Sequence, residues 1–226
     1  MNILVVAAHP DDEALGCGGT VARLAAEGHA VSIAILGQGA TSRDGLGADE
    51  AERLVTALRG QCREAGRLLG AAEVFPPVFP DNRFDTLPLL DLVKHVEKIV
   101  DAVRPDTVYT HHGGDLNIDH VLTFRAVLTA LRPMAGSGVS TLYSFEIPSS
   151  TDWAFGSFEP AFRPDTFVDI TATLEQKLRG LAVYESEGRP FPHPRSEQAL
   201  TALAQVRGST VGLAAAEAFV TVFSLR

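Results

Sequence analysis

The sequence has only two cysteines in 226 residues, Cys17 and Cys62. Two thiols are too few for a disulfide framework, so we expect a reducing compartment. No apolar run approaches the roughly 18 residues that a membrane-spanning helix needs, and no basic leader precedes the short apolar run at the N-terminus. These absences argue against a membrane span and a signal peptide, and they predict a cytoplasmic protein.

Basic charge is also scarce, with 19 Lys and Arg against 28 Asp and Glu, a formal net charge of −9. A surface of that sign repels phosphate backbones and anionic lipid headgroups, so we expect neither nucleic acid nor membrane partners. The G-x-G-x-x-G dinucleotide fingerprint and the G-x-S-x-G nucleophile elbow are both absent.

What the sequence does contain is an alternation of short apolar runs and helical patterns, which predicts a doubly wound, Rossmann-like α/β fold. We expect a mostly parallel sheet in the common order 3-2-1-4-5. Gly60 is expected to interrupt or bend the second helix. The predicted strands are Asn2–Ala8, Val31–Leu36, Glu73–Phe79, Thr107–His111 and Thr141–Ile147, and the predicted helices are Ala14–Glu27, Ala48–Leu69, Pro88–Val103 and Ile118–Leu131, with a loop at Gly37–Gly47.

The alternation fails beyond Pro148, where an irregular stretch precedes an elaborated C-terminal part. No linker or repeat separates this part, so we expect residues 1–226 to form a single domain. The small residues at Gly16–Gly19 are expected to let the first helix approach the sheet closely, in preference to a reactive role for Cys17. The C-terminal part is predicted to contain the irregular stretch Ser149–Pro164, a strand at Thr166–Ile170, helices at Thr171–Glu185 and Ser196–Val206, and a strand near Phe219–Phe223.

Metal-competent side chains follow two of the predicted strands. His9, Asp11 and Asp12 come directly after the first strand, and the segment that ends at His120 comes after the fourth. The predicted order makes these strands neighbours at the point where ligands collect in open α/β sheets. His9, Asp12 and His120 would then form a three-ligand metal site with a position for water, and Asp11 would be free to act as a base.

Simpler roles exist for the same residues. Acidic residues often cap the first turn of a helix, but capping explains one or two carboxylates, not the run Asp11–Glu13 behind a histidine. A histidine at a helix start, such as His120, is more often a cap or a surface residue. The predicted position of His120 opposite His9 favours the metal site. Asp119, which precedes His120, is expected to orient a metal ligand.

The segment Ala8–Glu13, followed by Asp-x-Asn-x-Asp-His at Asp115–His120, resembles the LmbE-like, or PIG-L, family of zinc-dependent N-deacetylases. The order of strands and helices to about residue 147 is similar too, and Pro192–Ser196 resembles the tail of bacterial sugar-processing members. The resemblance implies that Zn²⁺, or Fe²⁺ as an alternative, is held by His9, Asp12 and His120. It also implies that Asp11 is the general base.

Asn117 departs from the family pattern, in which many members have a histidine three residues before the last ligand. An amide can donate a hydrogen bond to a developing oxyanion but cannot carry a proton. Either Asn117 does this work alone, or His193 or another histidine supplies the missing charge.

Substrate contacts are predicted for Arg83, His193 and Arg195, with a polar turn or a solvated loop as equal alternatives. A sugar platform is one role for the aromatic residues of the irregular stretch, although core packing or a subunit contact is more expected. These aromatic residues are Trp153, Phe155 and Phe158.

The predicted function is removal of an acetyl group from the amide nitrogen of an N-acetylated amino sugar or sugar conjugate. The first alternative keeps the metal but changes the bond to another small amide or an ester. The second is a catalytically silent Rossmann-like binding module whose acidic loop only caps a helix. The resemblance is also compatible with a homo-oligomer.

Overall fold

The computed structural model describes residues 1–39, 47–134 and 138–225. Its seven strands form one sheet in the order β3-β2-β1-β4-β5-β7-β6. The pairs among β1 to β5 are parallel, whereas β7 is antiparallel to both β5 and β6. The predicted fold class and the order 3-2-1-4-5 are confirmed. The strands are β1 Asn2–Ala7, β2 Ala30–Ile35, β3 Glu73–Phe75, β4 Thr107–His111, β5 Thr141–Phe145, β6 Thr166–Asp169 and β7 Ala216–Ser224.

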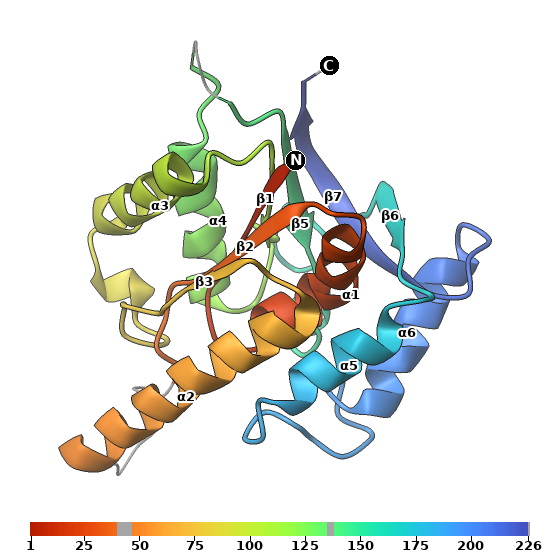
Figure 1. Cartoon of the computed structure of the whole chain (residues 1–226), viewed down its shortest axis with the longest axis horizontal. Helices are drawn as coiled ribbons and strands as arrows, with labels where there is room; N and C mark the ends of the chain where they lie inside the picture. The colour runs from red at the N-terminus through yellow and green to blue at the C-terminus, as the bar shows by residue number, and fades with distance from the viewer. Residues whose placement is uncertain (40–46, 135–137, 226) are drawn as a thin grey trace.

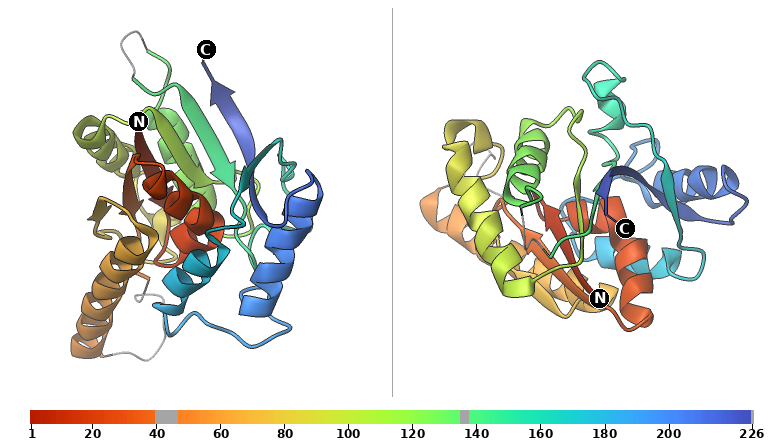
Figure 2. Two further views of the ribbon diagram at one scale, coloured as in Figure 1. Left: turned by 45° about the vertical axis from the view of Figure 1, so that its right-hand side comes forward. Right: turned by 90° about the horizontal axis from the view of Figure 1, so that it is seen from above.

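Helices cover both faces of the sheet (Figures 1 and 2). The helices α3 and α4 lie on one face, and α1, α2 and α5 lie on the other, so that two apolar cores sandwich the sheet. None of the helices in the described part of the chain is long and apolar enough to cross a membrane. The α-helices are α1 Asp12–Ala26, α2 Ala48–Leu69, α3 Leu89–Val103, α4 Ile118–Ala130, α5 Leu174–Ala182 and α6 Glu197–Ser209, and the short 3₁₀ turns are η1 Phe84–Thr86 and η2 Asp152–Ala154.

Two predictions about local structure are wrong. The helix α2 runs unbroken through Gly60, which is exposed and faces open space, so this glycine costs helix propensity without forcing a bend. The strand β3 begins at Glu73 as predicted but ends at Phe75 instead of Phe79, and among the described residues only an isolated bridge between Gly37 and Phe79 continues the pairing. The predicted loop Gly37–Gly47 lies mostly outside the described residues.

The glycines of α1 allow the close approach that the sequence predicts. A Cβ atom added at Gly16 would collide with the ring of Phe145, and one at Gly19 would lie 2.8 Å from Ile170 Cγ2. Cys17 between them is buried and its backbone is not helical, with φ −148° and ψ 21°. The helix therefore has a kink at Cys17, between two glycines that allow close packing.

The C-terminal part of the chain satisfies the hydrogen bonds that this kink leaves open. The carboxylate of Glu217 in β7 accepts from the backbone N–H of Gly19 at 3.0 Å. The ammonium of Lys177 in α5 donates to the carbonyl of Leu15 at 2.7 Å and contacts Glu217 at 2.5 Å. Because Lys177 and Glu217 are both buried, the position of α1 depends on residues far away in the sequence.

Candidate active site

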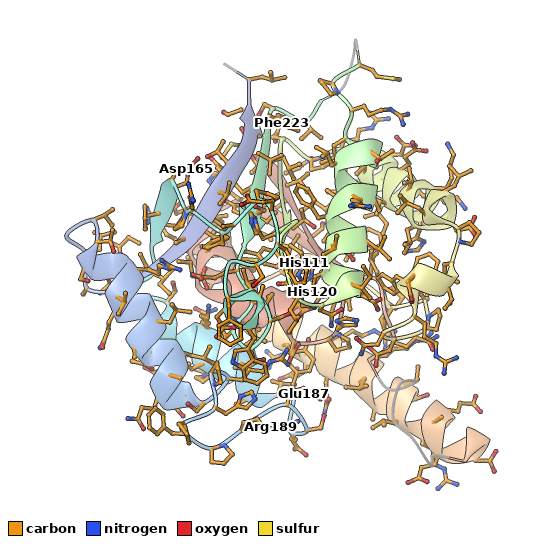
Figure 3. All side chains as sticks on the ribbon, turned by 180° about the vertical axis from the view of Figure 1, so that it is seen from behind. His111, His120, Asp165, Glu187, Arg189 and Phe223 are labelled. Atoms are coloured by element: carbon orange, nitrogen blue, oxygen red, sulfur yellow. The ribbon has the colours of Figure 1, made fainter. Side chains whose placement is uncertain are left out.

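The loops after β1 and β4 leave the sheet at the same edge. These strands pair in parallel from Ile3 with Thr107 to Val6 with Thr110, so their carboxyl ends lie side by side. Figure 3 shows His111 and His120 in the middle of this region, with the loop that carries Glu187 and Arg189 below them. The neighbouring strands thus bring the two predicted polar segments together.

His9, Asp12 and His120 converge as a three-residue group that can hold a metal ion. His9 Nδ1 lies 3.4 Å and His120 Nε2 lies 3.3 Å from Asp12 Oδ2. Ligands about 2.0–2.1 Å from a tetrahedral ion are separated by about 3.3 Å, which matches these distances. Among the described residues, Asp12 Oδ1 and His120 Nε2 have no hydrogen-bond partner although both are buried. The donor set therefore fits a divalent metal ion.

The electrostatics of this group also favour bound positive charge. Burial opposes the charged form of His9, but hydrogen bonds to Asp119 and Asp12 and nearby carboxylate charges raise its pKa to about 10. Burial likewise opposes the charged form of His120, yet Asp12 and Asp115 raise its pKa to about 9. A metal ion would take the place of one proton on each of these imidazoles.

Each histidine has a carboxylate on its second ring nitrogen. Asp119 Oδ2 lies 3.1 Å from His9 Nε2, as expected for a residue that orients a ligand. Asp115 Oδ1 lies 3.1 Å from His120 Nδ1, and Asp115 also accepts from the hydroxyl of Thr151 at 2.6 Å. Burial opposes the charge on Asp115, but these hydrogen bonds and the charge of His120 lower its pKa to about 2. Sequence reasoning missed this role, although Asp115 begins the segment that ends at His120.

Asp11 stands apart from the three-residue group. It precedes α1 as the N-cap residue but makes no capping hydrogen bond, so the interpretation of the acidic run as a mere cap is wrong. Its backbone is left-handed, with φ 101°, a conformation that costs a non-glycine residue about 1–3 kcal/mol. Its Oδ2 accepts from Arg195 Nη1 at 2.7 Å. Asp11 is therefore already engaged in an ion pair, whereas the sequence suggested that it would be free. Burial raises the pKa of Asp11 well above its usual value, against the opposing charge of Arg195.

A polar cleft of about 310 Å³ opens over these residues. Asn117 is the N-cap of α4, where its Oδ1 accepts from the N–H of Asp119 at 2.9 Å. Its Nδ2, the atom that would donate to an oxyanion, donates to Asn82 Oδ1 at 3.1 Å. The cleft is lined by His9, Pro10, Asp11, Asp12, Gly39, Leu58, Asp81, Asn82, Asn117, Ser186, Glu187, Arg189 and Arg195.

Of the three predicted substrate-binding residues, only Arg195 lines this cleft. Arg83 is exposed next to η1 and lies outside the lining. His193 also lies outside the lining. Its Nδ1 accepts from the N–H of Arg195 at 3.1 Å, and its ring packs against Trp153. Sequence reasoning did not single out Glu187, which lines the cleft and lies 3.8 Å from Arg195.

The expected core packing of the aromatic residues is wrong. Trp153 is 42% exposed, Phe155 84% and Phe158 49%. The segment that carries them turns back over the β4 loop, where the carbonyl of Pro160 lies 2.8 Å from His112 Nε2. The backbone of this segment thus contacts the β4 loop while these three rings remain at the surface.

The fold and the site together define a metal-binding α/β protein with a carboxylate beside the metal group. The family model for PIG-L, described as GlcNAc-PI de-N-acetylase, matches residues 4–131, more than half of the chain. The chain belongs to the PIG-L family. The resemblance seen in the sequence is thereby confirmed.

Two relatives are named as deacetylases. An uncharacterized deacetylase of Escherichia coli K12, YaiS, is 31% identical over 75% of this chain and 82% of its own length. The 2'-N-acetylparomamine deacetylase of Streptomyces fradiae is 28% identical over 81% of this chain and 72% of its own length.

Among solved structures, the 4-carboxy-2-hydroxymuconate hydratase of Pseudomonas putida KT2440 superposes with a TM-score of 0.77 at 23% identity. The match covers 100% of this chain and 98% of the hydratase. A hydratase on this scaffold means that the fold alone does not decide the reaction.

Proposed function

We propose that this protein is a zinc-dependent hydrolase that removes the acetyl group from the amide nitrogen of an N-acetylated amino sugar or sugar conjugate. The observation that carries the proposal is the convergence of His9, Asp12 and His120 on one point, where His9 and Asp12 line a polar cleft together with Asp11. The description of the family and the paromamine relative support an amino sugar as the substrate. Fe²⁺ suits the same donors and is the alternative ion.

The residues divide the work of amide hydrolysis between them. His9, Asp12 and His120 would hold the zinc ion, which when bound would polarise the amide carbonyl and lower the pKa of water toward about 7. Asp11 takes a proton from the attacking water and delivers it to the amine nitrogen as the amide bond breaks. A general base of this kind contributes about 10²–10⁴ in rate. Asp119 and Asp115 keep the two imidazoles in the orientation that metal binding needs.

The substrate contacts are proposed at the edge of the cleft. Arg195 lines the cleft, but its Nη1 already binds Asp11. Arg195 therefore also positions the general base. Arg83 and His193 lie outside the lining and would meet only a substrate that extends beyond the cleft. An extended conjugate therefore suits these two residues better than a free monosaccharide.

Three further proposals follow from the sequence. We propose a single domain over residues 1–226, which is supported by strands from both ends of the chain in one sheet. A cytoplasmic location is supported by the two free, buried cysteines, Cys17 and Cys62. A homo-oligomer is supported by the exposed aromatic residues Trp153, Phe155 and Phe158.

Replacing Asn117 tests whether its amide stabilises the oxyanion. We expect Asn117→Ser to lower kcat by about a hundredfold, because one oxyanion donor is worth about 10²–10³ in rate while serine still caps α4. Steady-state kinetics of acetate release measures the effect, and thermal unfolding checks the cap. A kcat within twofold of wild type would remove Asn117 from the reaction and leave the task to another group.

The proposed function is tested by acetate release from a panel of substrates after metal analysis of the purified protein. The panel contains N-acetylglucosamine, N,N'-diacetylchitobiose and 2'-N-acetylparomamine, with simple acetyl esters and N-acetyl amino acids beside them. We expect about one equivalent of zinc and acetate release that is fastest from an N-acetyl sugar. Faster cleavage of the esters or of the non-sugar amides would support the alternative hydrolase instead. A protein without bound metal and without activity on any member would support the silent binding module.

A further inference from the structure

A buried carboxylate–phenol pair lies directly behind Asp11. The side chain of Glu13 is fully buried, and its Oε2 accepts from the backbone N–H of Asp11 at 3.2 Å. Its Oε1 accepts from the hydroxyl of Tyr184 at 2.5 Å, and Tyr184 is 1% exposed. The two oxygens of Glu13 thus connect Asp11 to the C-terminal part of the chain.

The contact falls on a residue of the site whose backbone is strained. The left-handed backbone of Asp11, with φ 101°, is a conformation that L-residues adopt only when their surroundings impose it. The carbonyl of Asp11 is also fixed, since it accepts from the N–H groups of Ala14 at 3.0 Å and Leu15 at 2.9 Å. With the N–H bound to Glu13 and the carbonyl bound to α1, both sides of the residue are held.

This backbone conformation separates the directions of two adjacent carboxylates. Asp12 Oδ2 turns to His9 and His120, whereas Asp11 Oδ2 turns to Arg195. A relaxed turn with negative φ would rotate Asp11 relative to the three metal ligands. The direction of the Asp11 carboxylate therefore depends on the groups that keep the turn strained.

The position of Tyr184 is itself well determined. It follows the end of α5, the helix whose Lys177 binds both Leu15 of α1 and Glu217 of β7. The N–H of Tyr184 donates to the carbonyl of Leu181 at 3.0 Å. The phenol therefore reaches Glu13 from the segment just after α5, a helix that is already attached to α1.

We propose that Glu13 and Tyr184 are positioning residues that hold the strained turn at Asp11 and so aim its carboxylate at the attacking water. The inference rests on the proposed role of Asp11 as general base. A purely structural role, in which the pair only satisfies buried polar groups of the core, would affect stability but not the rate of the chemical step.

Two variants with a matched control separate these roles. Tyr184→Phe removes one hydroxyl, and Glu13→Leu with Tyr184→Phe removes both polar partners at similar volume. Tyr109→Phe is the control, because Tyr109 is also buried in the same core but makes no contact with Asp11. We expect the double variant to lose about ten- to a hundredfold in kcat, with KM within twofold and zinc content unchanged, since misplacement of a catalytic group by about 1 Å can cost 10²-fold. Tyr184→Phe alone should lose severalfold in kcat, and Tyr109→Phe should match wild type.

A double-mutant cycle tests whether the pair acts through Asp11. In an Asp11→Asn background, Tyr184→Phe should cause no further loss of kcat, because the group that it positions no longer accepts a proton. An equal loss in both backgrounds would overturn the proposal, as would an unchanged kcat in the double variant.

A crystal structure of the Glu13→Leu/Tyr184→Phe variant tests the geometry without any assay. We expect Asp11 to leave its left-handed conformation and its contact with Arg195. A turn identical to that of the wild type would overturn the inference even if the enzyme is active. Wild-type protein without acetate release would instead contradict the proposed function, and the crystal structure would still decide whether the pair sets the turn.

Discussion

Replacing His120 by alanine is expected to lower zinc affinity by more than a hundredfold and to bring acetate release below detection. The reason is that His120 Nε2 is one of three donors around the ion and has no hydrogen-bond partner among the described residues. Loss of an outer group that only orients a ligand costs about 10–100-fold in metal affinity, so loss of a ligand itself must cost more. Metal content after dialysis and a competition titration with a chromophoric chelator measure the change.

The control for this experiment is His112→Gln in the same segment. The Nε2 of His112 lies 2.8 Å from the carbonyl of Pro160 and does not belong to the metal group. This variant should retain about one equivalent of zinc. If His120→Ala binds zinc as tightly as the wild type, the metal is held elsewhere and the proposed hydrolase mechanism is wrong.

Asp11→Asn is expected to keep zinc but to lose about 10²–10⁴ in kcat. The amide has nearly the shape of the carboxylate but cannot accept the proton of the attacking water. Asparagine also tolerates the left-handed backbone at φ 101° better than alanine does, so this variant isolates the chemistry from the turn. Asp11→Ala should show a loss at least as large, because it adds backbone strain to the loss of the base.

Kinetics with metal content measured on the same samples give the comparison. Asp85→Asn is the matched control, since Asp85 is an exposed carboxylate of η1 that does not line the cleft. It should behave as wild type. Retained zinc with an unaffected rate in Asp11→Asn would exclude Asp11 as the base and leave the proton to another group.

The metal group was predictable from the sequence because every step of the argument is local or follows from parallel topology. His9 and Asp12 are three residues apart in one loop, and His120 follows the strand that pairs with β1. Since parallel neighbours end at the same edge, the two loops had to meet. The same logic predicted that Asp119 orients a ligand, although not that this ligand would be His9.

The environment of Asp11 was not predictable in the same way. Tyr184 and Arg195 come from irregular segments of the C-terminal part, and their contacts depend on how α5 and α6 pack. Hydrophobic periodicity gives no information about such pairings. Nor does it give the direction of β7, which enters the sheet antiparallel between β5 and β6.

The sequence predicted neither the kink at Cys17 nor the unbroken helix at Gly60. The kink at Cys17 exists because Lys177 and Glu217 satisfy the hydrogen bonds that it opens, which only tertiary packing reveals. Conversely, Gly60 suggested a break in α2, but an exposed glycine inside a helix does not force one. Tertiary contacts therefore decided the backbone at Cys17, whereas no contact at Gly60 imposes a break.

The insertion of β7 between β5 and β6 has a consequence for any attempt to trim the protein. A fragment limited to residues 4–131, the part shared with the family model, would end at α4 and leave β4 as an open border with unpaired backbone groups. It would also lack Phe145, which fills the space in front of Gly16. Unpaired sheet edges of this kind pair with other chains, so we expect the fragment to aggregate when it is expressed alone.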